Sequence, residues 1–187
     1  EVHPDMVALF GLDDGGLAMV ETAQGQSVFR VASTDNQRRG DLFIPMHWTD
    51  QTSGGGRTGL LPAQDRDPVS GQPGFKNTPA IIRTWSPPWT GFLVSKTMPP
   101  IPACTYWTRV RTAHGWLVEL AGNGEPDALL SLLSNGDLAE VRDSKRGILR
   151  AAVVCDGQLQ GALFIARDGG LPPGGMALGD AAHDAGD

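Results

Sequence analysis

The chain has 187 residues, and its 25 glycines and 14 prolines together make up about one residue in five, against roughly 12% in average proteins. This composition excludes a mostly helical bundle, and the length allows one substantial core and a smaller second one. The formal net charge of -6 argues against a general binder of nucleic acid or of anionic membranes.

The first half of the chain is predicted to be mainly β-structure around one long loop. Pro4 stands where helices often begin, and Gly11 stands where such a helix would end. The apolar and turn patterns predict these elements: a helix over 5–12, strands over 17–22 and 27–33 joined by a turn at Gly25, a strand over 42–44, a loop over 46–78 and a strand over 80–84. A loop of this length inside a compact domain is usually functional or disordered.

The second half begins with a segment that is rich in tryptophan and proline. Residues 85–108 contain three Trp and five Pro, which indicates an irregular arm that packs against a neighbouring surface. The elements expected after the arm are a strand over 116–121, a short helix over 125–134, a hairpin of strands over 148–154 and 159–166, and a frayed tail.

Positive charge is concentrated in the middle of the chain. Residues 1–29 hold five acidic and no basic residues, and residues 84–187 hold eleven acidic and eight basic residues. Between them, residues 30–83 hold seven basic and five acidic residues. This central segment is the part of the chain that best suits an anionic ligand.

Two motifs in the basic segment carry a resemblance to a known family. They are Gly40-Asp-Leu-Phe-Ile-Pro-Met-His-Trp48 and Asp67-Pro-Val-Ser-Gly-Gln-Pro-Gly-Phe-Lys76. Together with the opening His3-Pro-Asp and Gly11-Leu-Asp-Asp-Gly15, they resemble the C-terminal molybdopterin-dinucleotide-binding domain of the molybdenum oxidoreductases. The similarity is greatest to bacterial assimilatory nitrate reductase catalytic subunits; it covers about residues 2–84 and is weaker beyond them.

The resemblance implies a mainly β fold, namely a double-psi β-barrel with short helices and a smaller C-terminal α+β appendage. The divisions expected on this basis are the molybdopterin-dinucleotide-binding barrel over 1–84, a Pro/Trp-rich connecting arm over 85–108, the appendage over 109–170 and a flexible tail over 171–187. The resemblance also implies molybdopterin guanine dinucleotide as cofactor, in the bis-MGD form with molybdenum in the full-length enzyme. An iron-sulphur cluster is expected outside this chain.

Arg57 and Lys76 are the candidate cations for this cofactor. The run Thr52-Ser-Gly-Gly-Gly56 offers unobstructed backbone N–H groups and Arg57 a guanidinium that suits phosphate oxygens, although such a run is more often only a flexible loop. Lys76 matches the lysine with which the family contacts the cofactor; the alternative is a solvated surface lysine. Gly59 falls where related reductases commonly place an asparagine. Either that contact is lost, or Arg57 or Thr58 replaces it, or the alignment across the loop is shifted.

His47 and Trp48 follow the predicted strand over 42–44, at the position where the family's equivalents lie close to the active-site funnel. The pair is predicted to shape the substrate channel or to stack on the cofactor, and the alternative is a buried tryptophan beside a hydrogen-bonded histidine. No catalytic residue and no metal ligand is assigned. Cys104 and Cys155 have no partner at metal-ligand spacing and are expected to be thiols of a reducing cytoplasm.

The resulting hypothesis is a cofactor-binding C-terminal portion of an assimilatory nitrate reductase, which completes the pocket for reduction of nitrate to nitrite in the full-length enzyme. The chain is not expected to be catalytic on its own. Its expected partners are the remaining domains of the same subunit and the pterin dinucleotide, with no nucleic acid and no membrane. Two alternatives stay open: the same domain of a formate dehydrogenase-type molybdenum oxidoreductase, and a non-catalytic β-barrel interaction module.

The sequence features that bear on location agree with a cytoplasmic protein. No run approaches the ~18 consecutive apolar residues of a membrane span, and residues 1–20 lack the basic region that begins a signal peptide. The segment that starts at Glu1 already has the pattern of mid-domain sequence. We therefore expect a piece of a longer protein.

Overall fold

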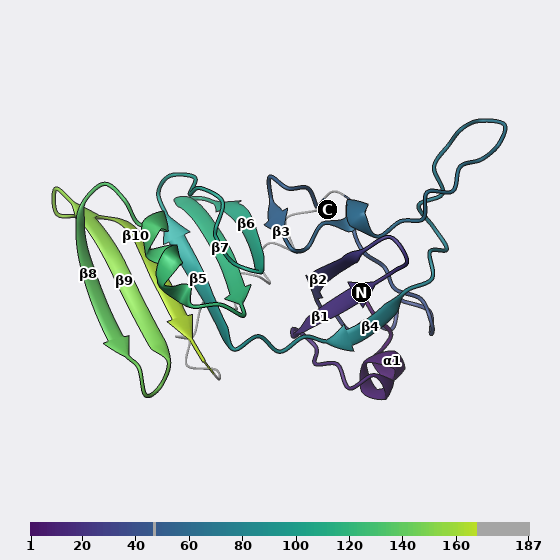
Figure 1. Cartoon of the computed structure of the whole chain (residues 1–187), viewed down its shortest axis with the longest axis horizontal. Coiled ribbons are helices and arrows are strands. Elements are labelled where there is room, and N and C mark those ends of the chain that lie inside the picture. Colours follow the sequence, from purple (N-terminus) through teal and green to yellow (C-terminus); the bar gives the residue numbers. More distant parts are fainter. Residues whose placement is uncertain (47, 168–187) are drawn as a thin grey trace. The chain divides into compact units, whose positions relative to one another are not determined.

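The computed structural model describes residues 1–46 and 48–167. The chain divides into two compact units, an N-terminal unit over Glu1–Ser86 and a C-terminal unit that begins at Pro87. Both units are built mainly from antiparallel β-strands (Figure 1). The prediction of a mainly β protein is therefore confirmed.

The N-terminal unit opens with helix α1 (Pro4–Leu9), close to the position predicted for a helix. The N–H of Asp5 donates to Nδ1 of His3 at 3.1 Å, so the His3 side chain satisfies one of the backbone donors that have no partner in the first turn. The helix ends before Gly11, whose φ of 59° is left-handed and is easily adopted by glycine. It is shorter than predicted because Phe10 has already left the helical conformation.

A three-stranded antiparallel sheet forms the centre of this unit, in the order β2 (Gln26–Arg30), β1 (Leu17–Glu21) and β4 (Ile81–Thr84). The predicted hairpin is confirmed, since β1 and β2 pair along their whole length. Its turn depends on Gly25, because a Cβ there would lie 3.0 Å from the carbonyl oxygen of Leu60. The hairpin is thereby packed directly against the long loop.

The remaining backbone pairings of this unit are isolated. Val2 bridges Ser33 in parallel and Leu42 in antiparallel orientation, so the strand predicted over 42–44 is present only as a single bridge. The predicted long loop contains two short elements, β3 (Ser53–Gly54) and the 3-10 helix η1 (Thr58–Leu60).

Over its described residues, 87–167, the C-terminal unit contains six long strands and one short helix. In the part of this unit that the structure describes, neighbouring strands are antiparallel and follow the order β6, β7, β5, β10, β9, β8. The elements are β5 (Trp89–Ser95), β6 (Tyr106–Thr112), β7 (Gly115–Gly122), η2 (Pro126–Leu132), β8 (Asp137–Asp143), β9 (Ile148–Cys155) and β10 (Gln158–Ala166).

The expectation of an irregular arm over 85–108 is wrong in its secondary structure. Strand β5 and the start of β6 lie within it, and Trp89 and Trp107 are buried in the core of the C-terminal unit. The prolines precede β5 or lie between the two strands, so they flank the strands and do not interrupt them. The predicted helix over 125–134 is present as the 3-10 helix η2, whose Leu129 is buried. The hairpin of β9 and β10 is confirmed.

Candidate functional site

The residues predicted to form the site lie between β2 and β4 of the N-terminal unit. Trp48 is half-buried, whereas Arg57, Gly59 and Lys76 are exposed. His47, the fifth predicted residue, lies outside the described residues. The following hydrogen bonds determine which of these positions come together.

The glycine-rich segment is attached to strand β2. The N–H of Val28 donates to the carbonyl of Gly55 at 2.7 Å, and the Ser27 hydroxyl donates to the carbonyl of Arg57 at 2.8 Å. Ser27 is fully buried, so its hydroxyl needs this acceptor. The backbone of Arg57 is thus held by the sheet while its side chain remains exposed to solvent.

Thr58 joins this segment to the segment that carries Trp48. Its hydroxyl donates to the carbonyl of Pro45 at 2.7 Å, and the residue is buried. Because Arg57 and Gly59 flank Thr58, this bond brings both of them close to the chain that leads into Trp48. Because its hydroxyl proton is used inside the unit, Thr58 could take the place of the missing asparagine only as a hydrogen-bond acceptor.

Thr78 makes the corresponding connection for Lys76. The N–H of Ala63 donates to the Thr78 hydroxyl oxygen at 3.0 Å. Lys76 is two residues from Thr78, and a chain of two residues spans at most ~7 Å. The chain just before Trp48 is therefore tied to η1 itself, and the chain just after Lys76 is tied to the segment that follows η1. Thr78 could not be recognised from the sequence, because a threonine in a polar loop gives no signal of its partner.

The Asp67 motif forms a closed turn ahead of Lys76. Oδ1 of Asp67 accepts hydrogen bonds from the N–H of Ser70 at 2.7 Å, the Ser70 hydroxyl at 2.9 Å and the N–H of Val69 at 3.0 Å. These bonds, first of all the one from the Ser70 N–H, lower the pKa of Asp67 below its ordinary value. Gly71 completes the turn with a φ of 69°. The Asp, Ser and Gly of this motif are thus explained by the hydrogen bonds and the backbone conformation of the turn.

Apart from Arg30, which donates to the carbonyl of Gly15, the basic residues of the central segment fall into two groups. Some form ion pairs with carboxylates of the same unit: Arg38 with Asp41, Arg39 with Asp5, and Arg83 with Glu21. Within the described residues, Arg57, Arg66 and Lys76 have no carboxylate partner. The unneutralised positive charge is therefore located on the predicted site and on the Asp67 turn, where an anion could approach it.

Two further features concern space and unused polar groups at the site. A Cβ added at Gly59 would meet nothing within 4 Å, so the position is open to a ligand. Ser53, which precedes the glycine run, is completely buried, and its hydroxyl has no hydrogen-bond partner among the described residues. Open space and exposed cations suit a large polar anion better than an apolar ligand, whereas the buried Ser53 hydroxyl is closed to solvent.

The described residues contain no group of three or more His, Cys, Asp or Glu side chains that could hold a metal ion. Cys104 and Cys155, both described, are free thiols. Burial raises the pKa of the Cys104 thiol to about 11, which makes it unreactive at neutral pH. Among the helices that are described, none is long and apolar enough to cross a membrane.

Comparison with known proteins identifies the class of domain. Residues 1–79 match the family model described as "Molydopterin dinucleotide binding domain". This match lies over the segment that carries the motifs, and it confirms the resemblance predicted from them. The cofactor of this class is a molybdopterin dinucleotide.

The curated relatives are nitrate reductases. The nitrate reductase of Klebsiella oxytoca is 43% identical over 124 residues, which are 66% of this chain and 14% of that protein. The assimilatory nitrate reductase catalytic subunit of Bacillus subtilis (strain 168) is 29% identical over 76 residues, which are 41% of this chain and 10% of that protein. The chain thus spans only a small part of the length of these relatives. No solved structure matches it.

Proposed function

We propose that this chain is the cofactor-binding C-terminal portion of an assimilatory nitrate reductase and that it completes the cofactor pocket for reduction of nitrate to nitrite. The observation that carries the proposal is the family match over residues 1–79, which contains Arg57 and Lys76, two exposed cations without a carboxylate partner among the described residues. The names of both relatives favour nitrate over formate as the substrate. The chain alone is not catalytic in this proposal.

The residues present fit molybdopterin guanine dinucleotide. Arg57 can donate two parallel hydrogen bonds to phosphate oxygens, and the ammonium of Lys76 can approach a phosphate or a carbonyl edge. Gly59 leaves room beside them, and Trp48 offers a planar apolar face. His47 remains part of this proposed set. The cofactor, with its molybdenum, supplies the two-electron redox chemistry, and the side chains of this domain bind and orient it.

Further features of the hypothesis remain proposals. We propose that the N-terminal unit is a double-psi β-barrel, which its mixed parallel and antiparallel bridges at Val2 support. The barrel is assigned to residues 1–84, the appendage to 109–170 and the tail to 171–187. The protein is assigned to the cytoplasm, which the two free thiols support. Its partners are the other domains of the same catalytic subunit, among them the one that holds an iron-sulphur cluster.

The direct test is cofactor occupancy in the full-length subunit encoded by the same reading frame. Cofactor is released from the purified protein and quantified as guanine nucleotide and as oxidised pterin fluorescence. Lys76→Ala should lower occupancy by about tenfold, because a hydrogen bond to a charged group contributes ~1.5–3 kcal/mol. Lys145→Ala is the matched control, since Lys145 is an exposed lysine of the C-terminal unit.

Equal occupancy in the Lys76→Ala and Lys145→Ala proteins would contradict the role given to Lys76. Absence of guanine nucleotide and pterin from the unsubstituted full-length protein would contradict the proposed function as a whole.

A further inference from the structure

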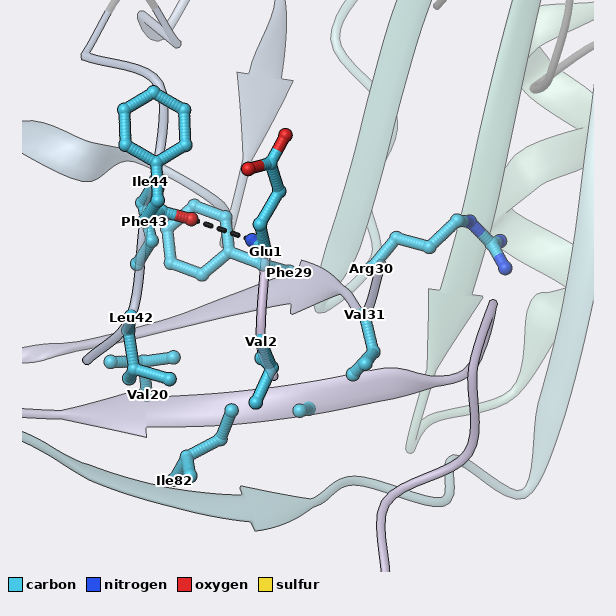
Figure 2. A pocket seen from close by; sticks show the side chains of 11 residues that line it. Glu1, Val2, Val20, Phe29, Arg30, Val31, Leu42, Phe43, Ile44 and Ile82 are labelled. Atoms are coloured by element: carbon cyan, nitrogen blue, oxygen red, sulfur yellow. Dashed lines mark hydrogen bonds between the residues drawn. The ribbon is translucent and has the colours of Figure 1, made fainter. Parts of the chain in front are cut away.

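An apolar groove lies on the N-terminal unit, and neither Arg57 nor Lys76 is among its lining residues. Figure 2 shows the side chains of Val2, Val20 and Ile82 directed toward one another, while the charged ends of Glu1 and Arg30 point away. The lining consists of Glu1, Val2, Ala18, Val20, Phe29, Arg30, Val31, Leu42, Phe43, Ile44 and Ile82. Nine of these eleven residues are apolar, so the groove suits an apolar occupant.

The floor and the walls of the groove differ in burial. Val2, Val20 and Val31 are at most 5% exposed, whereas Leu42, Ile44 and Ile82 on the walls are only half-buried. The buried apolar cluster of this unit consists of four described residues, namely Val2, Leu12, Ala18 and Val31. Such a cluster is small for a unit of this length, because a stable domain must bury enough apolar surface to offset its conformational entropy.

Two strand edges flank the groove without a neighbour. Within the described residues β4 pairs with β1 on one side and has no partner on the other. On the opposite wall, the N–H of Phe43 donates to the carbonyl of Glu1 at 3.1 Å, the amino group of Glu1 donates to the carbonyl of Phe43, and Leu42 bridges Val2. No described strand continues the pairing beyond Leu42 and Phe43.

The two edges determine what kind of chain could lie between them. Ile82 projects into the groove from the β4 edge, and Leu42 and Ile44 project into it from the other edge. An extended chain laid between them could hydrogen-bond to the open backbone groups and direct alternate side chains into the groove. A helix could fill the apolar space, but it would leave the backbone groups of both edges unpaired.

We propose that the groove takes up an extended, apolar segment of the same catalytic subunit, from the part of that polypeptide outside these 187 residues, and that this segment pairs as a strand with β4. This inference rests on the proposed function. The chain corresponds to only 14% of the Klebsiella oxytoca relative, so a full-length subunit has abundant sequence from which to supply the strand. Covalent linkage raises the effective concentration of such a segment, which favours it over a second copy of the chain.

Hydrogen exchange compares the 187-residue chain with the full-length subunit. Amides of β4 that do not pair with β1 should exchange about 100-fold more slowly in the full-length protein, since they then require local unfolding to exchange. The edge strand β8 of the C-terminal unit is the control, and its exchange should be the same in both proteins. Equal exchange of β4 in both would overturn the proposal.

Crosslinking then identifies the occupant. A photoreactive benzoylphenylalanine replaces Ile82 in the full-length subunit, and the matched control carries it at Ile81, which is 65% exposed and does not line the groove. The Ile82 position should crosslink within one chain to a segment outside the 187 residues, and the Ile81 position should not. A crosslink between two chains would assign the groove to a second copy and overturn the proposal.

Cofactor occupancy measured on the same full-length samples separates the two proposals. Cofactor without protection of β4 would reject the strand and leave the proposed function intact. Protection of β4 without cofactor would reject the proposed function and retain the docked strand.

Discussion

The two units of the chain bury very different amounts of apolar surface. The buried cluster of the C-terminal unit has eleven described residues, including Trp89, Leu93 and Leu163, whereas that of the N-terminal unit has four. The strands of the C-terminal sheet are mostly joined by short turns, so neighbouring strands supply each other's core. The N-terminal unit depends on pairings between distant segments, and it keeps both a groove and a set of unpaired cations exposed. We therefore expect the C-terminal unit to be the more stable of the two on its own.

Separating the units gives the largest expected effect. A fragment over 87–167 should unfold cooperatively with a free energy of unfolding of about 5 kcal/mol, which is ordinary for a domain of this size. A fragment over 1–86 should show no cooperative transition, because its apolar groove is open. Chemical denaturation followed by circular dichroism measures both. If the isolated 1–86 fragment unfolded cooperatively, the difference in stability between the two units would be contradicted.

A substitution in strand β10 tests the core of the C-terminal unit. Leu163 is completely buried, so Leu163→Ala should lower the free energy of unfolding by about 3 kcal/mol through lost burial and the cavity left behind. Leu159 lies on the same strand and is 50% exposed, so Leu159→Ala should cost less than about 0.5 kcal/mol. Urea denaturation of both variants measures the difference. Similar losses for the two leucines would show that Leu163 is not a core residue.

The smallest effect is expected at the Asp67 turn of the N-terminal unit. The folded state lowers the pKa of Asp67 below 3.8, so the stabilisation of the turn is complete above that pH and is lost as the pH falls through the lower, folded value. The Ser70 amide resonance should move toward its unstructured position over that range. Asp67→Asn should produce the same change at neutral pH, without altering the unfolding of the C-terminal unit. An unchanged Ser70 resonance would contradict the turn.

Much of the fold could be predicted from local sequence. The hairpin of β1 and β2 follows from two strand-like runs around Gly25, and the hairpin of β9 and β10 follows from the Asp156-Gly157 turn. Strands β5, β6 and β8 were not predicted, and the reasons differ between β5 and β8. The prolines on either side of β5 suggested irregular structure, although they only flank the strand. The sequence of β8 is polar because both faces of this strand are largely exposed at a sheet edge.

The candidate site was predictable in its residue types and unpredictable in its geometry. Arg57 and Lys76 could be selected because of their charge and their place in the family motifs. The bonds that bring their segments together, from Thr58 to Pro45 and from Ala63 to Thr78, join residues 13 and 15 positions apart in a stretch without periodicity. Nothing in such a stretch indicates which hydroxyl meets which backbone group.

By itself the sequence determined the β-rich class, the main hairpins and the family, because turn residues, alternating apolar positions and short motifs are local properties of a chain. Tertiary structure alone decided that Trp89 and Trp107 are core residues, that the Asp67 motif closes a turn, and that Ile82 faces a groove while Ile81 does not. These outcomes depend on contacts between residues far apart in the chain. Such contacts are set by the balance of burial and hydrogen bonding over the whole unit, which no local pattern contains.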